Sequence, residues 1–455
     1  MKAPLFFQRR FLPMWTALCL GAFADNMLRQ ALIIGIAFGA VPVGGFSRPD
    51  DAIPVVGSLF AVAVLVFSSI SGQVAERCET AMLFRRLKFI EVALMAGAAV
   101  GFFLNSGWLL VGVLFAMGAQ SAFFSPARVG AMPKYLYTNE LVRGNGFCNA
   151  GLYVSILTGL FMGGLLIAEP GGGIKVGGVL FAASLLGWLA VLFAPPAAAD
   201  APDLKLDWNP LRQSGRIFGY AFSAAGVARP LLGVALFYFI STLVTVLAPL
   251  YARGPLGADE AVATAIMGLF AVGVGAGALA ASSLAKRRSG LGFSALGVCL
   301  AGACSLLVYA LTLALPPAEA PRGFDLFLDS PQGLALGAVL IVSAIAMGLY
   351  VVPLQAAMQR RAPSERRSRI MAAGNMANAV AAICGSLSVL FVTGGALAPH
   401  QAFLAVAFLQ AAVAAYMLRR RGRVREGLYD EMLADGSAIA VARPAGAAPA
   451  VENQP

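Results

Sequence analysis

The first long apolar run of this chain contains residues that can carry charge and form hydrogen bonds. Asp25, Asn26 and Arg29 lie near the middle of residues 11–42, which are otherwise mostly apolar. A charged side chain at the centre of a bilayer costs about 2.5–3.5 kcal/mol on insertion scales, so such groups face a protein interior or a wet space and often mark a transport path. The polar residues of this run are therefore the first candidates for function.

Two interpretations of these residues stay open. Asp25 and Arg29 are four residues apart, so in a helix they share one face and can form an ion pair. Such a pair could lock this helix to a neighbour, or the two charges could contact a substrate. The general behaviour of ionisable residues in membranes favours the second interpretation.

The composition places these residues in a membrane protein. Apolar residues make up 59% of the chain, charged residues 12%, and the mean hydropathy is +0.80, whereas soluble domains average about 25% charged residues. A spanning helix needs about 20 apolar residues. We predict an all-α polytopic membrane protein with 12 transmembrane helices, at about 11–42, 52–75, 87–105, 107–136, 140–168, 173–195, 230–253, 261–285, 290–316, 332–360, 367–395 and 400–419.

The predicted spans divide into two groups of six. Residues 1–195 would form one six-helix half and residues 230–420 the other, with a cytoplasmic linker at 196–229 and a disordered tail at 421–455. In the linker, Asn209-Pro210 predicts a helix start, and the spacing after it predicts an amphipathic helix, either on the membrane surface or packed on the bundle. A layout of two halves favours a site between them, near the middle of the membrane.

The charge distribution predicts the orientation of the chain. The net charge is +11, but of the basic residues only Arg48, Lys175, Arg253 and Arg322 fall in the predicted outside connections. This positive-inside bias predicts that both termini lie in the cytoplasm. Because the basic residues follow the membrane topology, the positive net charge does not indicate binding to nucleic acid. The six cysteines are scattered without metal-type spacing, so we expect no metal, no cofactor and no disulfide framework.

The connection between the second and third predicted spans carries a charged cluster. Glu76 and Arg77 follow Gly72 closely, and Arg85, Arg86 and Lys88 come next. We interpret these residues as a charged clamp at the cytoplasmic face, with Glu76, Arg77 and Arg85 as candidate gating residues. A simple positive-inside anchor would need the basic residues but not Glu76.

Three stretches carry a more specific signal: 21–34, 123–166 and 348–380. They contain Asp25-Asn26 with Arg29, Ser125-Pro126-Ala127-Arg128-Val129-Gly130, Glu140 to Gly146, Val351 to Leu354, and Asn375 with Asn378. Together they resemble the lysophospholipid transporter branch of the major facilitator superfamily, including the transporter part of members fused to an acyltransferase. The loop around Glu76 also resembles the conserved loop of that superfamily.

The chain departs from the family pattern at several positions. Arg128 stands where the family has lysine, which keeps the charge but changes its geometry, and Val129 replaces an aromatic residue. The tail is too short for the fused acyltransferase. That enzyme class also needs a histidine followed five residues on by aspartate, but the only histidine is His400 and position 405 is Ala405. We therefore expect no enzyme activity.

The resemblance and the polar residues together give a set of candidate substrate-binding residues: Asp25, Asn26, Arg29, Gln120, Arg128, Asn145, Asn149, Tyr350, Gln355, Asn375 and Asn378. A guanidinium at Arg128 could hold a phosphodiester through two hydrogen bonds, or it could reach back to the membrane interface. The two asparagine pairs could equally join neighbouring helices.

The resemblance implies transport of lysophosphatidylethanolamine or a related lysolipid across the bacterial inner membrane by alternating access. The substrate and the membrane lipids would be partners, and a separate acyltransferase would re-acylate the lipid in the cytoplasm. On this interpretation Asp25 would meet an ethanolamine ammonium, and Arg128 or Arg29 the phosphate. The alternative is a proton-coupled exporter of drugs or metabolites in which Asp25 carries the proton.

Overall fold

Long helices form the computed structural model of this chain, and no strand occurs among the residues that the structure describes. Those residues are 5–46, 48–137, 140–204, 215, 219, 226–285, 291–315, 322–323, 330–361 and 367–419. The first six long helices are α1 (Leu12–Ala37), α2 (Ala52–Arg77), α3 (Thr80–Phe103), α4 (Gly107–Tyr135), α5 (Leu141–Ala168) and α6 (Gly172–Leu192). The next six are α8 (Ala228–Arg253), α9 (Glu260–Ala285), α10 (Leu291–Leu313), α12 (Pro331–Arg361), α13 (Arg367–Leu387) and α15 (Pro399–Arg419).

Three short helices lie in the connections of the described chain, namely η1 (Leu5–Phe7), η2 (Pro49–Asp51) and α14 (Leu390–Thr393). The helix α14 directly follows α13, so the eleventh predicted span is broken near Ser388. The predicted helix at 209–225 in the linker and the predicted disordered tail lie outside the described residues, apart from isolated positions at 215 and 219.

The prediction of an all-α membrane protein is confirmed. By length and composition, 11 of the described helices could cross a membrane. The remaining long helix is α3, which carries Arg85, Arg86, Lys88 and Glu91 within its first half. Backbone groups in lipid must pair within the segment, and helices of this length satisfy that requirement.

The start of the third span was predicted wrongly. The helix α3 begins at Thr80 and not near residue 87, because the side chain of Glu79 caps it. The carboxylate of Glu79 accepts hydrogen bonds from the backbone N–H groups of Ala81 at 2.9 Å and Met82 at 2.7 Å. These bonds satisfy donors that a helix start leaves free.

A turn at residues 105–107 separates α3 from α4. Asn105 has φ of 50°, the only positive φ of a residue other than glycine in the described chain, and asparagine tolerates this conformation better than most residues. The backbone N–H of Ser106 donates to Gly101 O at 2.8 Å. The chain therefore reverses between α3 and α4.

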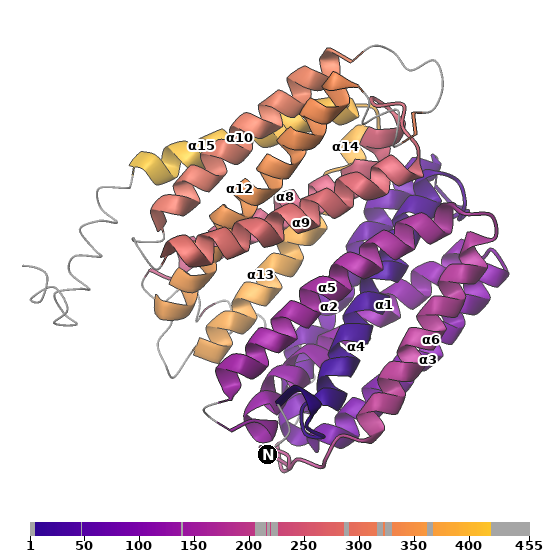
Figure 1. Cartoon of the computed structure of the whole chain (residues 1–455), viewed down its shortest axis with the longest axis vertical. Helices are drawn as coiled ribbons and strands as arrows, with labels where there is room; N and C mark the ends of the chain where they lie inside the picture. Colours follow the sequence, from indigo (N-terminus) through magenta and orange to yellow (C-terminus); the bar gives the residue numbers. More distant parts are fainter. Residues whose placement is uncertain are drawn as a thin grey trace, which may run out of the picture.

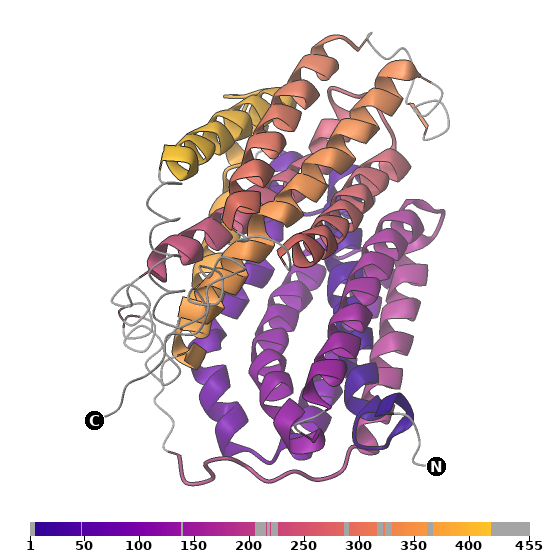
Figure 2. The ribbon, with the colours of Figure 1, turned by 60° about the vertical axis from the view of Figure 1, so that its left-hand side comes forward.

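The helices form two bundles that lie side by side, as Figures 1 and 2 show. In the N-terminal half, α1 packs on α5 and α6, α2 on α4, and α3 on α6. In the C-terminal half, α12 packs on α9 and α10, and α13 on α8. The halves meet where α13 runs along α2 and α9 runs along α5, so the predicted arrangement of two six-helix halves is confirmed.

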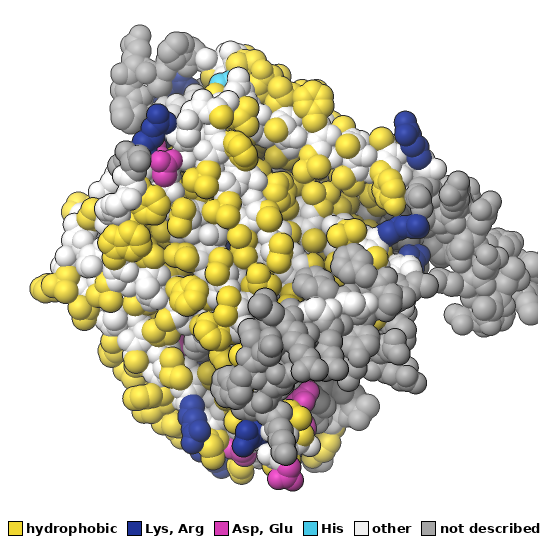
Figure 3. Space-filling model, turned by 180° about the vertical axis from the view of Figure 1, so that it is seen from behind, with side chains coloured by type: hydrophobic (Ala, Val, Ile, Leu, Met, Phe, Trp, Pro, Cys, Tyr) yellow, Lys and Arg dark blue, Asp and Glu magenta, His cyan; other side chains and the backbone are white. Residues whose placement is uncertain are grey.

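The outside of the molecule fits a lipid environment. Figure 3 shows hydrophobic side chains over most of one face, with charged side chains gathered toward its ends. Phe103, Leu279 and Phe408 are 73%, 75% and 69% exposed. A soluble protein rarely exposes a continuous apolar surface of this kind, so these side chains face the hydrocarbon of the membrane.

Candidate functional site

The carboxylate of Asp25 lies in the middle of α1, and only one of its two oxygens has a hydrogen-bond partner among the described residues. The hydroxyl of Ser121 on α4 donates to Asp25 Oδ2 at 2.6 Å. The other oxygen, Asp25 Oδ1, is buried and has no hydrogen-bond partner among the described residues. An unpaired buried acceptor is costly in a stable structure, so Asp25 Oδ1 is a place where a donor from another molecule would be stabilised.

Asn26 and Arg29 form a second contact on the same helix. The amide of Asn26 donates to Ala22 O at 2.8 Å and accepts from Arg29 Nη2 at 2.9 Å. Arg29 and Asp25 do not form an ion pair within the described structure, since Arg29 turns to Asn26 and Asp25 turns to Ser121. The expected direct pair is therefore not formed, and each charge keeps capacity for further hydrogen bonds.

The position of α1 decides what these side chains face. The helix contacts α5, α6, α2 and α4 of its own half and α8 and α9 of the other half, so it lies inside the molecule. Most of its side chains are buried, whereas Asp25, Asn26 and Arg29 keep partial exposure. The accessible space that they face is therefore internal.

A line of polar residues on α4 extends this space toward one end of the bundle. Ser121, Ser125 and Arg128 follow a spacing of four and three residues, so they share one helix face. Ser121 touches Asp25, Ser125 is exposed and Arg128 is partly exposed. The guanidinium of Arg128 has no hydrogen bond or ion pair with any described residue. This face leads from Asp25 to the end of α4 near Tyr135.

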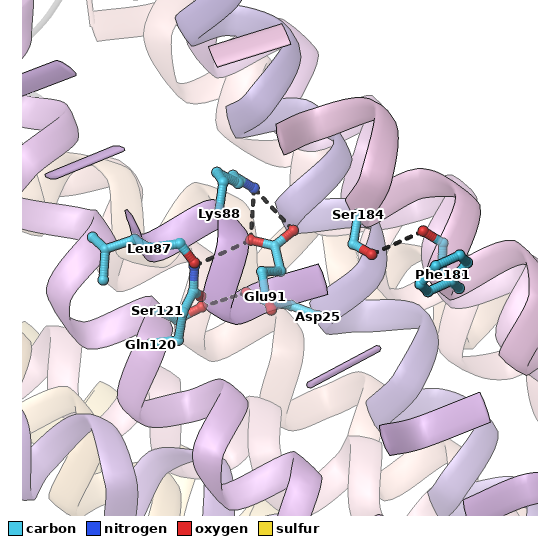
Figure 4. A network of polar contacts seen from close by, with 8 residues as sticks. All are labelled: Asp25, Leu87, Lys88, Glu91, Gln120, Ser121, Phe181 and Ser184. Atoms are coloured by element: carbon cyan, nitrogen blue, oxygen red, sulfur yellow. Dashed lines mark hydrogen bonds and ion pairs between the residues drawn. The ribbon is translucent and has the colours of Figure 1, made fainter. Parts of the chain in front are cut away.

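A buried ion pair lies beside this site, and Figure 4 shows it with its neighbours. Lys88 Nζ donates to Glu91 Oε1 at 2.9 Å and to Glu91 Oε2 at 2.7 Å. Gln120 Nε2 donates to Glu91 Oε2 at 3.1 Å and to Leu87 O at 3.2 Å. Gln120, predicted to bind substrate or a neighbouring helix, thus bonds to α3.

The structure corrects the assignment of Lys88 to a charged clamp at the face of the membrane. Lys88 and Glu91 are 0% and 1% exposed. They are also functional candidates that the sequence analysis missed, together with Ser121. The signal was available, because a lysine and a glutamate three residues apart inside the predicted span 87–105 would share a helix face.

The other candidate residues are not gathered at Asp25. Tyr350 is 1% exposed and its hydroxyl donates to Gly233 O of α8 at 2.9 Å, so it lies in the core of the C-terminal half. On α12, Gln355 is partly exposed, and on α13, Asn375 is exposed. Asn378, also on α13, has a buried Oδ1 without a partner among the described residues. The side chains of Asn145 and Asn149 on α5 lie outside the described residues.

The halves are joined near the loops at 38–51 and 394–398, which we call the Arg48 end. Arg48 Nη1 donates to Thr393 O at 2.8 Å, and Ser386 Oγ donates to Pro54 O at 2.7 Å. The guanidinium of Arg253 on α8 donates to Ala37 O of α1 and pairs with Asp50. These bonds between the halves close the Arg48 end.

The opposite end of the bundle, which we call the Arg85 end, contains the predicted gating residues. Glu76 and Arg77 are exposed, and Arg85 donates to Leu192 O at 3.3 Å and to Ala194 O at 3.0 Å, both in the same half. We expect the partner of Glu76 in the other half to be Arg360, Arg361 or Arg366. Arg361 donates to Gly226 O, and the side chains of Arg360 and Arg366 lie outside the described residues.

The bonds on Glu79 stabilise this end further. Glu79 Oε1 accepts from the backbone N–H of Ala197 at 2.7 Å, in addition to the two bonds that cap α3. Partial burial disfavours the charged carboxylate, but the hydrogen bonds from Ala197, Ala81 and Met82 outweigh it and hold the pKa of Glu79 below its ordinary value. Glu79 thus ties the start of α3 to the segment after α6.

The arrangement at Asp25 offers charged and polar groups that could bind a ligand. Among the described residues, no group of three or more His, Cys, Asp or Glu side chains could hold a metal ion. Asp25 and Arg29 present opposite charges within one helical turn. They can therefore receive the ammonium and the phosphate of a zwitterion without changing the net charge of the internal space.

Comparison with known proteins agrees with this architecture. The family model described as Major Facilitator Superfamily matches residues 14–386. The chain is 28% identical over 361 residues to the "Lysophospholipid transporter LplT" of Citrobacter koseri, a match that covers 78% of this chain and 80% of that protein. It is 26% identical over 347 residues to the protein of the same name from Serratia proteamaculans, which covers 75% of this chain and 78% of that protein.

Solved structures share the fold at low identity. A peptide transporter POT in complex with alafosfalin superposes with a TM-score of 0.66 at 14% identity, covering 90% of this chain and 94% of that chain. The nucleoside transporter NupG superposes with a TM-score of 0.64 at 13% identity, covering 90% of this chain and 99% of that chain. These likenesses show the fold alone.

Proposed function

The chain belongs to the Major Facilitator Superfamily and is a multi-pass membrane protein of the transporter type, and from that premise we propose that its substrate is a lysophospholipid. The relatives named lysophospholipid transporter support this substrate class. So does the chemistry of α1, which offers an anion and a cation in an otherwise apolar bundle. A lysolipid has a polar head group and a single acyl chain, and it needs both kinds of surface.

The observation that carries the proposal is the free oxygen of Asp25. Asp25 Oδ1 is buried without a partner among the described residues, while Ser121 fixes the other oxygen. The ammonium of lysophosphatidylethanolamine would supply the missing donor. A hydrogen bond to a charged group contributes about 1.5–3 kcal/mol, so the contact would favour an ammonium head group by roughly ten- to a hundredfold, since 1.4 kcal/mol is a factor of about ten.

The phosphate would be received by arginine. Arg29 lies one turn from Asp25 and holds a single described hydrogen bond, to Asn26. Arg128 lies further along the polar face of α4 and makes no described hydrogen bond. A guanidinium can bind a phosphate through two parallel bonds, so Arg29 would serve the bound head group and Arg128 the head group on its way to the Arg85 end.

We further propose the membrane, orientation and partner. The chain would lie in the bacterial inner membrane with the Arg48 end outside and the Arg85 end and both termini in the cytoplasm, following the positive-inside bias. In this orientation, a structure whose halves are bonded to each other at the Arg48 end is a state that is closed to the outside. Alternating access would break these bonds, admit a lysolipid from outside, and release it in the cytoplasm for a separate acyltransferase.

The test measures lysolipid movement by the purified protein in liposomes. Wild-type protein should move fluorescent lysophosphatidylethanolamine between leaflets, and Asp25→Asn should reduce the rate by more than tenfold at unchanged insertion. Asparagine keeps the size of the side chain but lacks the charge. Glu169→Gln is the matched control, because Glu169 is an exposed acid paired only with Lys175 at the surface, and it should transport like wild type.

The alternative function gives a different result. In a proton-coupled exporter, Asp25→Asn would abolish drug resistance or proton-driven efflux, and wild-type protein would leave lysolipid in its original leaflet. Normal lysolipid transport by a well-inserted Asp25→Asn protein would remove the charge of Asp25 from the mechanism.

A further inference from the structure

We infer that the buried pair Lys88–Glu91 positions Asp25, through Gly21 on α1 and through Gln120 and Ser121 on α4, so that Asp25 Oδ1 is held free for the cationic part of a substrate. The choice of a lysolipid as that substrate rests on the proposed function. The positioning itself does not, because it concerns any ligand whose cation reaches Asp25.

The pair is enclosed by the helices of the N-terminal half. Lys88 and Glu91 come from α3, and both nitrogen–oxygen distances are below 3 Å. Lys88 Nζ also lies 4.9 Å from the ring centroid of Phe124 on α4, a distance at which a cation and an aromatic ring attract. The ammonium therefore has a fixed position between α3 and α4.

The pair presses against the helix that carries Asp25. A Cβ added at Gly21 of α1 would lie 2.5 Å from Lys88 Nζ and 3.5 Å from Glu91 Oε2. Only glycine leaves room for this approach. Gly21 is four residues before Asp25 and therefore lies on the same face of α1. We infer that the contact with the pair sets the position of α1 along its axis and its rotation relative to α3, and with them the position of Asp25.

The second connection runs through two consecutive residues of α4. Gln120 donates to Glu91 Oε2 and to Leu87 O, which fixes the rotation of α4 against α3. Ser121 is the next residue, and its hydroxyl donates to Asp25 Oδ2. Because Gln120 faces α3, Ser121 is directed toward α1, as Figure 4 shows. The bond from Ser121 leaves Asp25 Oδ1 as the oxygen without a hydrogen-bond partner among the described residues.

Lys88 and Glu91 belong to a group of charged side chains around Asp25. Glu91, Lys88 and Arg29 all act electrostatically on Asp25. A buried ion pair is often no more stabilising than well-packed apolar residues of the same volume. Its contribution in this protein is geometric, since the pair gives Gln120 an acceptor and gives α1 a fixed neighbour.

The experiment compares two glycine-to-alanine substitutions whose added Cβ atoms would lie near the same lysine, Lys88. Gly21→Ala should displace Lys88 Nζ, whereas a Cβ at Gly187 of α6 would lie 3.9 Å from Lys88 Cδ and Nζ, an ordinary contact. Gly187→Ala is therefore the matched control. Alanine favours a helix over glycine by about 1 kcal/mol, so neither change weakens its own helix.

Transport in liposomes is measured with two lysolipids. For Gly21→Ala we expect KM for lysophosphatidylethanolamine to rise at least fivefold, while KM for lysophosphatidylglycerol, which lacks the ammonium, changes less than twofold. Gly187→Ala should leave both values unchanged. Gln120→Leu should reproduce the selective loss of Gly21→Ala. An equal rise of KM for both lipids would show a general structural defect and overturn the inference.

A ligand that is not a lipid separates this inference from the proposed function. Binding of dodecylammonium, a single-chain cation, is measured on detergent-solubilised protein, with Asp25→Asn defining the signal of the Asp25 site. Gly21→Ala should raise Kd at least fivefold over Gly187→Ala. If wild type moves no lysolipid but this difference is present, the proposed function fails and the positioning role stands. Equal dodecylammonium affinity in the two alanine variants would refute the positioning role.

Discussion

At the scale of single residues, Arg128 is a charged side chain on α4 that is only partly exposed. Ser121 and Asn26 bond to Asp25 and Arg29, whereas the guanidinium of Arg128 has no hydrogen bond or ion pair with the described residues. Charged groups at this depth are costly unless paired or hydrated. Arg128 lies on the same face of α4 as the serine that touches Asp25, and under the proposed function we expect it to bind the phosphate of the lysolipid.

We predict that Arg128→Lys keeps part of the lysolipid transport and that Arg128→Ala loses most of it. Lysine preserves the charge but not the two-bond geometry, so we expect a two- to fivefold loss for lysine and more than tenfold for alanine. The measurement is the initial rate of lysophosphatidylethanolamine flipping in liposomes with matched protein content. Equal rates for Arg128→Ala and wild type would leave Arg128 as an anchor at the membrane interface.

At the scale of elements, the capped start of α3 links two parts of the N-terminal half. Glu79 accepts from two N–H groups of α3 and from Ala197 beyond α6. Its lowered pKa means that the folded state prefers the charged carboxylate. The stability that Glu79 adds is therefore fully present above the ordinary pKa of about 4.3, and it is lost as the pH falls through the lower pKa of the folded state.

We predict that Glu79→Gln lowers the unfolding temperature in detergent by about 1–3 °C at neutral pH, as expected for a weakened helix cap. The difference from wild type should stay constant from about pH 8 to pH 5 and should shrink as the pH falls below the ordinary glutamate pKa of about 4.3, toward the lower pKa of Glu79 in the folded state. Thermal unfolding followed by circular dichroism across this range checks both statements. Glu76→Gln, at an exposed acid at the end of α2, should leave the unfolding temperature at neutral pH unchanged. A difference between Glu79→Gln and wild type that grows toward low pH would contradict a lowered pKa of Glu79 in the folded state.

At the scale of the whole molecule, transport requires that contacts at the two ends oppose each other. Arg253 holds the Arg48 end by bonding to Ala37 O and Asp50 of the other half. Glu76 lies exposed at the Arg85 end, where we expect it to hold the opposite closed state. Exposed ion pairs contribute about 0.2–1 kcal/mol each, so removing one should shift a balanced equilibrium by roughly 1.4- to fivefold.

We predict that Arg253→Gln and Glu76→Gln shift this equilibrium in opposite directions. In a background without native cysteines, Ile33→Cys, at a position 1% exposed in this state, reports opening at the Arg48 end. Ser125→Cys, at an exposed position on the face of α4 that touches Asp25, reports opening at the Arg85 end. Arg253→Gln should speed thiol labelling at 33, and Glu76→Gln should speed it at 125.

A membrane-facing cysteine provides the control for these rates. Phe103→Cys, at a position 73% exposed, should be labelled equally in all variants. Shifts of both reporters in the same direction would show a general loosening of the bundle. Unchanged labelling together with a changed head-group preference would show that Glu76 shapes the binding site and does not gate it.

The sequence alone predicts the fold class, the arrangement in two six-helix halves and the presence of ionisable residues within the first span. These follow from local properties: the length of apolar runs, the turn at Asn105, and the cost of charge in hydrocarbon. The prediction failed at the start of α3, where the side chain of Glu79 extends the helix toward residue 80. An apolar-run criterion does not detect a polar cap.

Which polar groups contact one another depends on the tertiary structure. Asp25 and Arg29 share a helix face, yet Asp25 bonds to Ser121 of α4 and Arg29 to Asn26. Lys88 looked like part of a surface cluster, yet α3 places it in the core with Glu91. Sequence spacing gives the neighbours along one helix, but partners on other helices depend on how the helices pack, and close approaches such as that of Gly21 to Lys88 are set by that packing.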